Sequence, residues 1–434
     1  MAKKTDKKFS LTKSNFGGRG WIVILLVLFS IFLQSSIIND SLNVTIPAFA
    51  AAHGWNIQLL YMMSTVTAWV AVFAAILWGH LARKSAKTVW AVSLGIVIVT
   101  LLVWAQSNNP NRLWLYITAL LVASVAGQGF NYTGSYNVIN NWFPRKKGLA
   151  MGWATIGFPL SALATIPILE YGIMPNLGLS GVYYFYAAFA AVMLVLVLLL
   201  VKNYPEQAGK IPDNDKSLDR AALDAELKKG VEHIKTSEWT IKKLLKTGNV
   251  WKIGLTFGVF GLIAIGVMTN FMPRALQAGY TEEEVIPMLM ITGVVACVGS
   301  YLCGILDAKV GPKKASVMTM FLAVVALLVN IIPSKAAMYI SLPLIGVLLG
   351  GAANYLVSIT TTIWGRYDFP NAYRVLLPMN NLVGAMGVAI VGVIGNTEGL
   401  GYTVAYAVIA GLALIAAIVM MTIKDEPVKA VDVK

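Results

Sequence analysis

The amino-acid sequence predicts an all-α membrane protein with twelve transmembrane helices arranged as two six-helix bundles. Hydrophobic residues make up 57% of the 434 residues and charged residues only 12%, and the mean hydropathy is +0.71. Soluble domains carry roughly 25% charged residues, so this composition indicates that lipid is the main solvent. Two hydrophobic blocks, 21–201 and 250–423, flank a polar stretch. At about 20 apolar residues per span, each block holds six helices.

The order of the elements follows from where apolar runs are interrupted. A basic tail at 1–20 precedes the first block, a linker at 202–249 joins the blocks, and a second tail occupies 424–434. The first span is too long for the apolar core of a cleavable signal peptide, so we expect it to be retained. The expected spans are 21–49, 58–82, 88–106, 112–139, 148–171, 181–201, 250–276, 284–308, 314–333, 336–363, 370–395 and 401–423.

The distribution of basic residues predicts the orientation. Of the 34 Lys and Arg residues, all but Arg112, Arg274 and Lys335 fall on the side of the termini and the linker. Cytoplasmic loops carry such an excess, so we expect both termini and the linker to be cytoplasmic, in the cell membrane of a bacterium. The net charge of +14 then reflects orientation in a lipid bilayer rather than binding to nucleic acid.

Two interpretations of the linker remain open. Apolar residues recur at helical spacing between charges in 217–234, and Trp239 with the following Leu and Lys residues suits a short helix on an anionic membrane surface. The alternative is a solvated tether between the two halves. Cys297 and Cys303 are six residues apart on one span, so they face different sides of a helix and no disulfide is expected.

Two short sequence features each occur twice, separated by almost the same number of residues, which indicates an internal repeat. Gly79 and Gly304 begin the polar ends of the second and eighth spans, 225 residues apart. Phe143-Pro144 and Phe369-Pro370 open the fifth and eleventh spans, 226 residues apart. Agreement within one residue, in equivalent loops, predicts two bundles related by an axis along the membrane normal.

These loops resemble those of a known family. The run Gly304-x-Leu-x-x-Lys-x-Gly311-x-Lys-Lys is similar to the signature loop of the major facilitator superfamily, and 141–152 resembles the fourth loop of its oxalate/formate-antiporter-like branch of organic-anion carriers. The resemblance covers essentially the whole chain. It implies the major facilitator fold and secondary transport by rocking of two bundles around one central site. Such carriers act on small solutes, with protons as a coupling ion, and we expect a monomer.

The resemblance also implies a set of gating residues, with departures. The family's loop has an acid two residues after its Leu, where this chain has Arg83 in the first copy and Ala308 in the second, with Asp307 one place early. The ion pair that gates the first half is therefore in question. The residues assigned to gating and signature loops are Gly79, Arg83, Arg145, Gly304, Asp307, Gly311 and Arg374.

Asp40 is the clearest candidate for coupling, because an ionisable group within a span is costly and is a functional suspect by default. Ser36, Asp40, Asn43 and Pro47 follow one stripe of the first helix. The run from Asp40 to Pro47 also looks like a motif of drug/proton antiporters. The competing interpretation is that Asp40 lies close enough to water to be a solvated rim residue.

Polar side chains in the middle of several spans predict a wet binding site. Amides and phenols in lipid need partners, which neighbouring helices or a water-filled cavity supply. Interhelical hydrogen bonding alone is the competing explanation. On the first, fourth, seventh and tenth helices these faces fit the cavity-lining role that the family resemblance implies. The candidate substrate-binding residues are Gln34, Asp40, Asn43, Gln128, Asn131, Tyr132, Tyr136, Asn270, Asn354, Ser358, Asn380 and Asn381.

The absence of a deeply placed base narrows the substrate. Anions are usually met by Arg or Lys, yet Arg274 and Arg374 lie near span ends. A dianion such as oxalate is therefore disfavoured. We expect a monocarboxylate or amphipathic organic anion, moved by proton symport or exchange, and the alternative is a proton-coupled antiporter for drugs or lipophilic cations. Three histidines in separate places, without metal-ligand spacing, a phosphate loop or a nucleophile elbow, argue against an enzyme and against a bound metal or cofactor.

Overall fold

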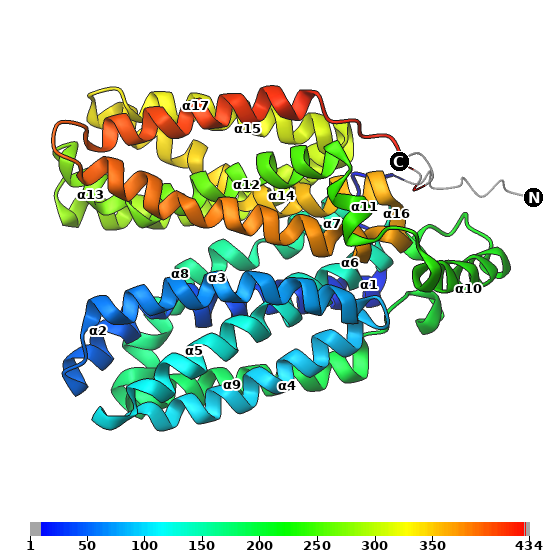
Figure 1. The fold of residues 1–434 in the computed structure, drawn as a ribbon, viewed down its shortest axis with the longest axis horizontal. Coiled ribbons are helices and arrows are strands. Elements are labelled where there is room, and N and C mark those ends of the chain that lie inside the picture. Colours follow the sequence, from blue (N-terminus) through cyan, green and yellow to red (C-terminus); the bar gives the residue numbers. More distant parts are fainter. Residues whose placement is uncertain (1–9, 429, 431–434) are drawn as a thin grey trace, which may run out of the picture.

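The fold is built entirely from helices in the part of the chain that the computed structural model describes, residues 10–428 and 430. Two groups of roughly parallel helices lie side by side, with α1 to α9 in one and α12 to α17 in the other (Figure 1). The first comprises α1 (Gly17–Ser35), η1 (Ser36–Asp40), α2 (Leu42–His53), α3 (Ile57–Ala82), α4 (Ala86–Trp104), α5 (Leu113–Gly127), η4 (Gln128–Ser135), α6 (Tyr136–Trp142), α7 (Lys147–Ala154), α8 (Gly157–Pro167), η5 (Ile168–Ile173) and α9 (Met174–Leu200).

The second group contains fewer but longer elements, namely α12 (Gly248–Thr269), α13 (Phe271–Gln277), α14 (Glu282–Val310), α15 (Pro312–Asn330), α16 (Lys335–Asn396) and α17 (Gly401–Met421). Ten segments in the described residues are long and apolar enough to cross a membrane, with a shorter one at Lys335–Gly351. Two of the long helical runs turn back, at Gly178 and Gly365, where positive φ angles of 64° and 74° suit glycine. Counting the arms on either side of these turns gives the predicted twelve spans.

The two turns differ from the expected loops. We expected irregular connections at 172–180 and 364–369, but helical backbone continues almost to each turn. A single glycine in a conformation that other residues rarely adopt reverses the chain without a longer loop. The helices next to these turns are therefore longer than the predicted spans.

The two bundles approach most closely at the end where the linker helix α10 lies, which we term the linker end (Figure 1). A Cβ atom built on Gly304 of α14 would meet the Cα of Gly152 of α7 at 2.9 Å. A Cβ atom on Gly79 of α3 would meet the Cβ of Arg374 of α16 at 2.4 Å. Glycine is needed here because the helices approach very closely where the two bundles meet, a contact surface that we term the seam. The glycines of the sequence repeat therefore mark the contact between the bundles.

The linker is docked against both bundles rather than suspended as a tether. Its elements are η6 (Glu206–Ala208), η7 (Pro212–Asn214), α10 (Arg220–Thr236) and α11 (Ile241–Leu245). Trp239 and Leu244 are buried, and the indole of Trp239 meets that of Trp364 edge to face at 6.2 Å. Helical spacing predicted α10 correctly, while the tether interpretation is wrong for the described part of the linker. Trp239 and Leu244 pack on protein rather than on lipid or water, whereas Leu245 is exposed.

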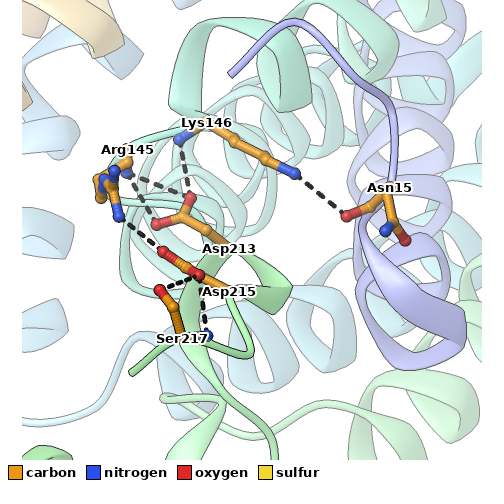
Figure 2. Close-up of polar contacts among 6 residues, drawn as sticks. All are labelled: Asn15, Arg145, Lys146, Asp213, Asp215 and Ser217. Atoms are coloured by element: carbon orange, nitrogen blue, oxygen red, sulfur yellow. Dashed lines mark hydrogen bonds and ion pairs between the residues drawn. The ribbon is translucent and has the colours of Figure 1, made fainter. Parts of the chain in front are cut away.

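Acidic residues of the linker clamp the loop between α6 and α7 (Figure 2). Asp213 accepts hydrogen bonds from the backbone N–H of Lys146 at 2.7 Å and of Arg145 at 3.2 Å. The Asp215 carboxylate pairs with the Arg145 guanidinium at 2.7 Å and accepts from the Ser217 hydroxyl at 2.6 Å. Arg145, a predicted gating residue, is therefore held by the linker, next to the first turn of α7.

The same clamp perturbs two acids outside the spans. Burial raises the pKa of Asp213 to about 6, although the backbone N–H groups of Lys146 and Arg145 oppose that effect. Burial also acts to raise the pKa of Asp215, but hydrogen bonds from Ser217 and the charge of Arg145 outweigh it and hold the pKa below its ordinary value. Asp215 is consequently the firmer anionic partner of the loop.

A buried ion pair joins the start of the linker to the second bundle. Arg366, just after the turn in α16, makes two parallel bonds of 2.8 and 2.9 Å to the Glu206 carboxylate. Its guanidinium also lies over the rings of Tyr204 and Tyr367, at 5.2 and 5.5 Å. The side chains are only 9% and 2% exposed, so each charge depends on the other. The pair ties the linker across the seam.

Removing one partner of this pair is expected to destabilise the protein strongly. Glu206→Ala leaves the buried Arg366 charge uncompensated, which costs on the order of 3–5 kcal/mol. Thermal unfolding of the purified protein in detergent measures the change. Glu232→Ala is the matched control, because its pair with Lys235 is 66–67% exposed and such pairs contribute roughly 0–1 kcal/mol. Equal midpoints for the two variants would contradict the assigned role of the buried pair.

Candidate functional site

Asp40 ends a π-helical turn in the first span and meets a cluster of hydroxyl groups. The Ser161 hydroxyl of α8 donates to its carboxylate, and the Ser35 hydroxyl donates at 3.2 Å. Ser36 bridges to Ser161 at 2.9 Å and to Thr165 at 2.7 Å. Asp40 takes part in none of the ion pairs found among the described residues. The carboxylate is thus half-buried and solvated by hydroxyls rather than by a cation.

The predicted stripe along the first helix is only partly retained. Ser36 joins the Asp40 cluster, but Asn43 is exposed and makes no side-chain hydrogen bond to that cluster within the described part of the chain. The reason is the π turn η1, closed by a bond from the Ser41 N–H to the Ser36 carbonyl at 2.9 Å. Its wider turn rotates every later residue away from the α-helical stripe. π turns are rare and often lie at functional sites, and the sequence spacing gave no sign of this one.

A second π-helical segment, η4, carries the polar run of the fourth span. The Asn131 amide donates to the Gln34 amide oxygen of α1 at 3.3 Å, which brings two predicted residues together. Gln128 Oε1 and Asn131 Oδ1 are buried without a hydrogen-bond partner in the described part of the chain. Buried amide oxygens without a partner are costly, so they are suited to receive a ligand or water.

Aromatic rings adjoin these amides. Tyr132 lies 5.8 Å from Tyr136 and 6.3 Å from Phe158 of α8, measured between ring centroids. Tyr136 in turn lies 6.4 Å from Tyr373 of α16, so the rings come from both bundles. Sequence reasoning found Tyr132 and Tyr136 but missed Phe158 and Tyr373, because isolated aromatic residues are ordinary in apolar spans. We call the set Gln34, Gln128, Asn131, Tyr132, Tyr136, Phe158 and Tyr373 the amide–aromatic patch.

Two other predicted residues, Asn354 and Asn270, make hydrogen bonds within the protein. Asn354 accepts from Thr155 across the seam at 3.1 Å and donates to the Ser300 carbonyl at 3.1 Å. Asn270 donates to the Gly266 carbonyl at 3.0 Å, where α12 gives way to α13. Asn354, the repeat counterpart of Gln128, thus acts as a tie between spans in this conformation. Interhelical bonds account for the side chain of Asn354, and a bond within its own helix accounts for that of Asn270, in both cases without a ligand.

Three further predicted residues lie outside the patch contacts. Asn380 donates to Asn381 at 3.2 Å, and both are half-buried on α16. The Ser358 hydroxyl is buried and adjoins the carboxylate of Asp307. Among the described side chains, these three therefore make no hydrogen bond or ring contact with the amide–aromatic patch.

The predicted gating residues cluster at the linker end. Asp307 of α14 is buried against the first turn of α7, where a Cβ on Gly148 would meet its carboxylate oxygen at 2.1 Å. An acid is favoured at a helix N-terminus, so this contact ties the seam electrostatically. Gly311, with φ of 84°, caps the end of α14. At the equivalent contact between α3 and α16, Arg83 stands where the family pattern would place an acid, and its charge acts on Arg374.

Arg274 serves the second bundle alone. Its guanidinium donates to the Asn330 side chain at 3.1 Å and main chain at 2.7 Å, and to Thr403 at 3.3 Å. It also lies 5.6 Å from the ring centroid of Tyr406. These contacts join α13, α15 and α17 at the end away from the linker, so Arg274 holds helices of the second bundle together. Its described contacts include no residue of the amide–aromatic patch, so Arg274 does not supply a positive charge there.

Comparisons with known proteins agree with this architecture. A profile described as "Major Facilitator Superfamily" matches residues 21–375. The chain is 19% identical over 377 residues to an uncharacterized transporter of that type, YhjX of Escherichia coli K12, covering 84% of this chain and 86% of that protein.

Two relatives are described by the solutes they carry. A probable chloroplastic anion transporter of rice is 27% identical over 247 residues, 55% of this chain and 43% of that protein. The oxalate:formate antiporter of Oxalobacter formigenes is 28% identical over 91 residues, 21% of each chain. The chain thus spans less than half the length of both of these relatives.

Solved structures share the fold. The human organic anion transporter MFSD10 superposes with a TM-score of 0.70 at 15% identity, covering 93% of this chain and 99% of that one. The proton:xylose symporter XylE gives 0.73 at 12% identity, covering 95% and 98%. At such identities the likeness concerns the arrangement of helices alone.

Proposed function

The chain belongs to the major facilitator superfamily and is a transporter rather than an enzyme, and we propose that its solute is an organic monocarboxylate or amphipathic organic anion. The amide–aromatic patch carries this proposal. It offers two buried, unpartnered amide oxygens and four aromatic rings, and no lysine or arginine takes part in the described contacts among its members. Such a surface suits a solute with a large apolar body and at most one charge.

The names of two relatives support an anion as the solute. Among them, anion transport is the named activity in rice, and exchange of oxalate with formate is named in Oxalobacter formigenes. Formate and similar acids carry one charge, whereas the lack of a base at the patch disfavours a dianion. The alternative is a proton-coupled antiporter for lipophilic cations, which the rings of the patch and the Asp40 carboxylate would also accommodate.

Orientation and coupling belong to the same proposal. The linker end, with both described chain ends near it, is the cytoplasmic side of a bacterial cell membrane, as the excess of basic residues favours. The bundles comprise 21–201 and 250–423, joined by the cytoplasmic linker 202–249, and the protein works as a monomer. Because the bundles meet at the linker end, the conformation described here is closed toward the cytoplasm. Asp40 is the proton-binding group.

Uptake into proteoliposomes tests the solute class. With an inwardly directed proton gradient, radiolabelled lactate and benzoate are expected to accumulate at least about tenfold over empty liposomes, a factor worth about 1.4 kcal/mol. Oxalate and tetraphenylphosphonium, tested alongside, are expected to stay near background. Accumulation of the cation alone, driven by proton exchange, would favour the antiporter alternative. Uptake of oxalate faster than of both monocarboxylates would overturn the assignment of solute charge.

A further inference from the structure

Two arginines lie together at the linker end of the seam between α3 and α16. Gly79 packs against Arg374, and Arg83 follows Gly79 by one helical turn on the same face. The positive charge of Arg83 acts electrostatically on the guanidinium of Arg374. Arg374 is only 6% exposed. Two like charges in such a place are unfavourable unless acceptors surround them.

The acceptors are backbone carbonyls of the linker. Arg83 Nη2 donates to the Ile234 carbonyl at 2.8 Å, in the last turn of α10, and Arg374 Nη2 donates to the Trp239 carbonyl at 3.4 Å. The Nε atoms of both arginines are buried and have no hydrogen-bond partner in the described part of the chain. The described contacts therefore satisfy each guanidinium only in part.

The carboxylate of Asp368, which lies on α16 with Arg374, already has partners. Asp368 pairs with the His233 ring at 2.7 Å and accepts from the Ser237 hydroxyl. Neither Arg83 nor Arg374 occurs in any ion pair among the described residues. The counterpart seam has the opposite chemistry, because there Asp307 faces the start of α7. The two seams thus differ in charge although the repeat relates their positions.

A guanidinium with free N–H groups is the side chain best matched to a carboxylate, which it binds through two parallel hydrogen bonds. Carbonyl oxygens of the linker occupy part of that role while the bundles are closed. Separation of the bundles at this end would remove α3 from α16 and expose both arginines to the solute path. A carboxylate that arrives from the linker side could then bind to both guanidinium groups, because neither is already paired with a carboxylate among the described residues.

We infer that Arg83 and Arg374 form a carboxylate-binding site at the linker-end mouth of the transport path, capped by linker residues 234–239 when that end is closed. The inference rests on the proposed function and deepens it. Recognition of the solute is divided between two places, with its charge bound at the mouth and its apolar body bound at the amide–aromatic patch. This division accounts for an organic-anion carrier without a base in mid-membrane.

Transport kinetics measured separately from each side test the inference. In proteoliposomes of fixed orientation, Arg83→Gln and Arg374→Gln are expected to raise the KM for benzoate at the linker side about tenfold or more, as loss of a charged hydrogen bond does. The KM at the opposite side should stay unchanged, and Arg83→Lys should recover part of the loss. Lys84→Gln, exposed beside Arg83, is the matched control. Equal KM changes on both sides, or none, would overturn the site.

A chemical measurement on the unmodified protein keeps the two proposals separable. Phenylglyoxal modifies accessible arginines, and mass spectrometry reports the extent at Arg83 and Arg374. Benzoate is expected to protect both from the linker side, while Arg19 and Arg220 react equally with and without it. Lack of protection sinks the arginine site even where benzoate is transported. Protection without any transport of monocarboxylates would instead reject the proposed function and keep the site.

Discussion

Asp40→Asn is expected to abolish proton-driven accumulation of the solute while leaving exchange of internal for external solute in place. The asparagine side chain keeps the size and the hydrogen-bonding oxygen that Ser161 and Ser35 contact, but it has no proton to take up or release. A carrier coupled through this one carboxyl would then equilibrate its solute without concentrating it. The expected loss in gradient-driven accumulation is at least about tenfold, or about 1.4 kcal/mol.

The measurement compares two assays on the same proteoliposomes. Accumulation is followed with and without an imposed pH gradient, and exchange is followed by counterflow at equal pH on both sides. Asp40→Glu should retain part of the coupling because it restores an ionisable group. Glu170→Gln is the control, since Glu170 is an exposed carboxyl near the end of the fifth span. Unchanged dependence on the pH gradient in Asp40→Asn would remove Asp40 from coupling.

The charge and hydropathy patterns predict the spans well because both are local properties of the chain. Each span must be apolar along about 20 residues, and each loop on one side carries Lys or Arg, as at Arg145. The turns at Gly178 and Gly365 were placed less well. Whether a glycine bends the chain there depends on a φ angle that composition does not express.

The site was predicted by residue type more than by geometry. Gln34 and Asn131 were both candidates, and they do meet. The wide turn at Ser36–Asp40 was missed, since a periodicity argument assumes 3.6 residues per turn and this segment departs from it. Tyr373 was missed because its contact with Tyr136 joins residues from different bundles, which no local pattern reveals.

The linker shows the same limit. The sequence shows that the linker contains acidic residues, but it does not show their partners, because those of Asp213 lie 67 and 68 residues away in sequence. Composition therefore described a charged segment equally compatible with a tether. Only the fold places the carboxylate of Asp213 against the start of α7 and that of Glu206 against Arg366 (Figure 2 shows the first of these). The linker is thus part of the closed seam rather than a spacer.

The closed seam leads to the second large effect, which is expected from Gly304→Val. Any Cβ at this position would meet the Gly148 carbonyl oxygen at 2.8 Å and the Gly152 Cα at 2.9 Å, and both are backbone atoms that have little freedom to yield. Valine adds two further methyl groups, and overpacking of this kind costs typically 1–3 kcal/mol. The cost falls on closure of the bundles at the linker end, since the clash lies between the bundles rather than within one.

A carrier that fails to close one end cannot alternate, so Gly304→Val is expected to lower transport to near background while the protein remains folded and soluble in detergent. Gly304→Ala should give an intermediate rate because it adds the Cβ alone. Gly95→Val on α4 is the matched control, since a Cβ there meets nothing within 4 Å. A cysteine in place of Ser358, in protein whose two native cysteines are replaced, reports accessibility from the linker side. Its labelling should rise in Gly304→Val, and transport at the unmodified rate in that variant would refute closure by contact of Gly304 with Gly152.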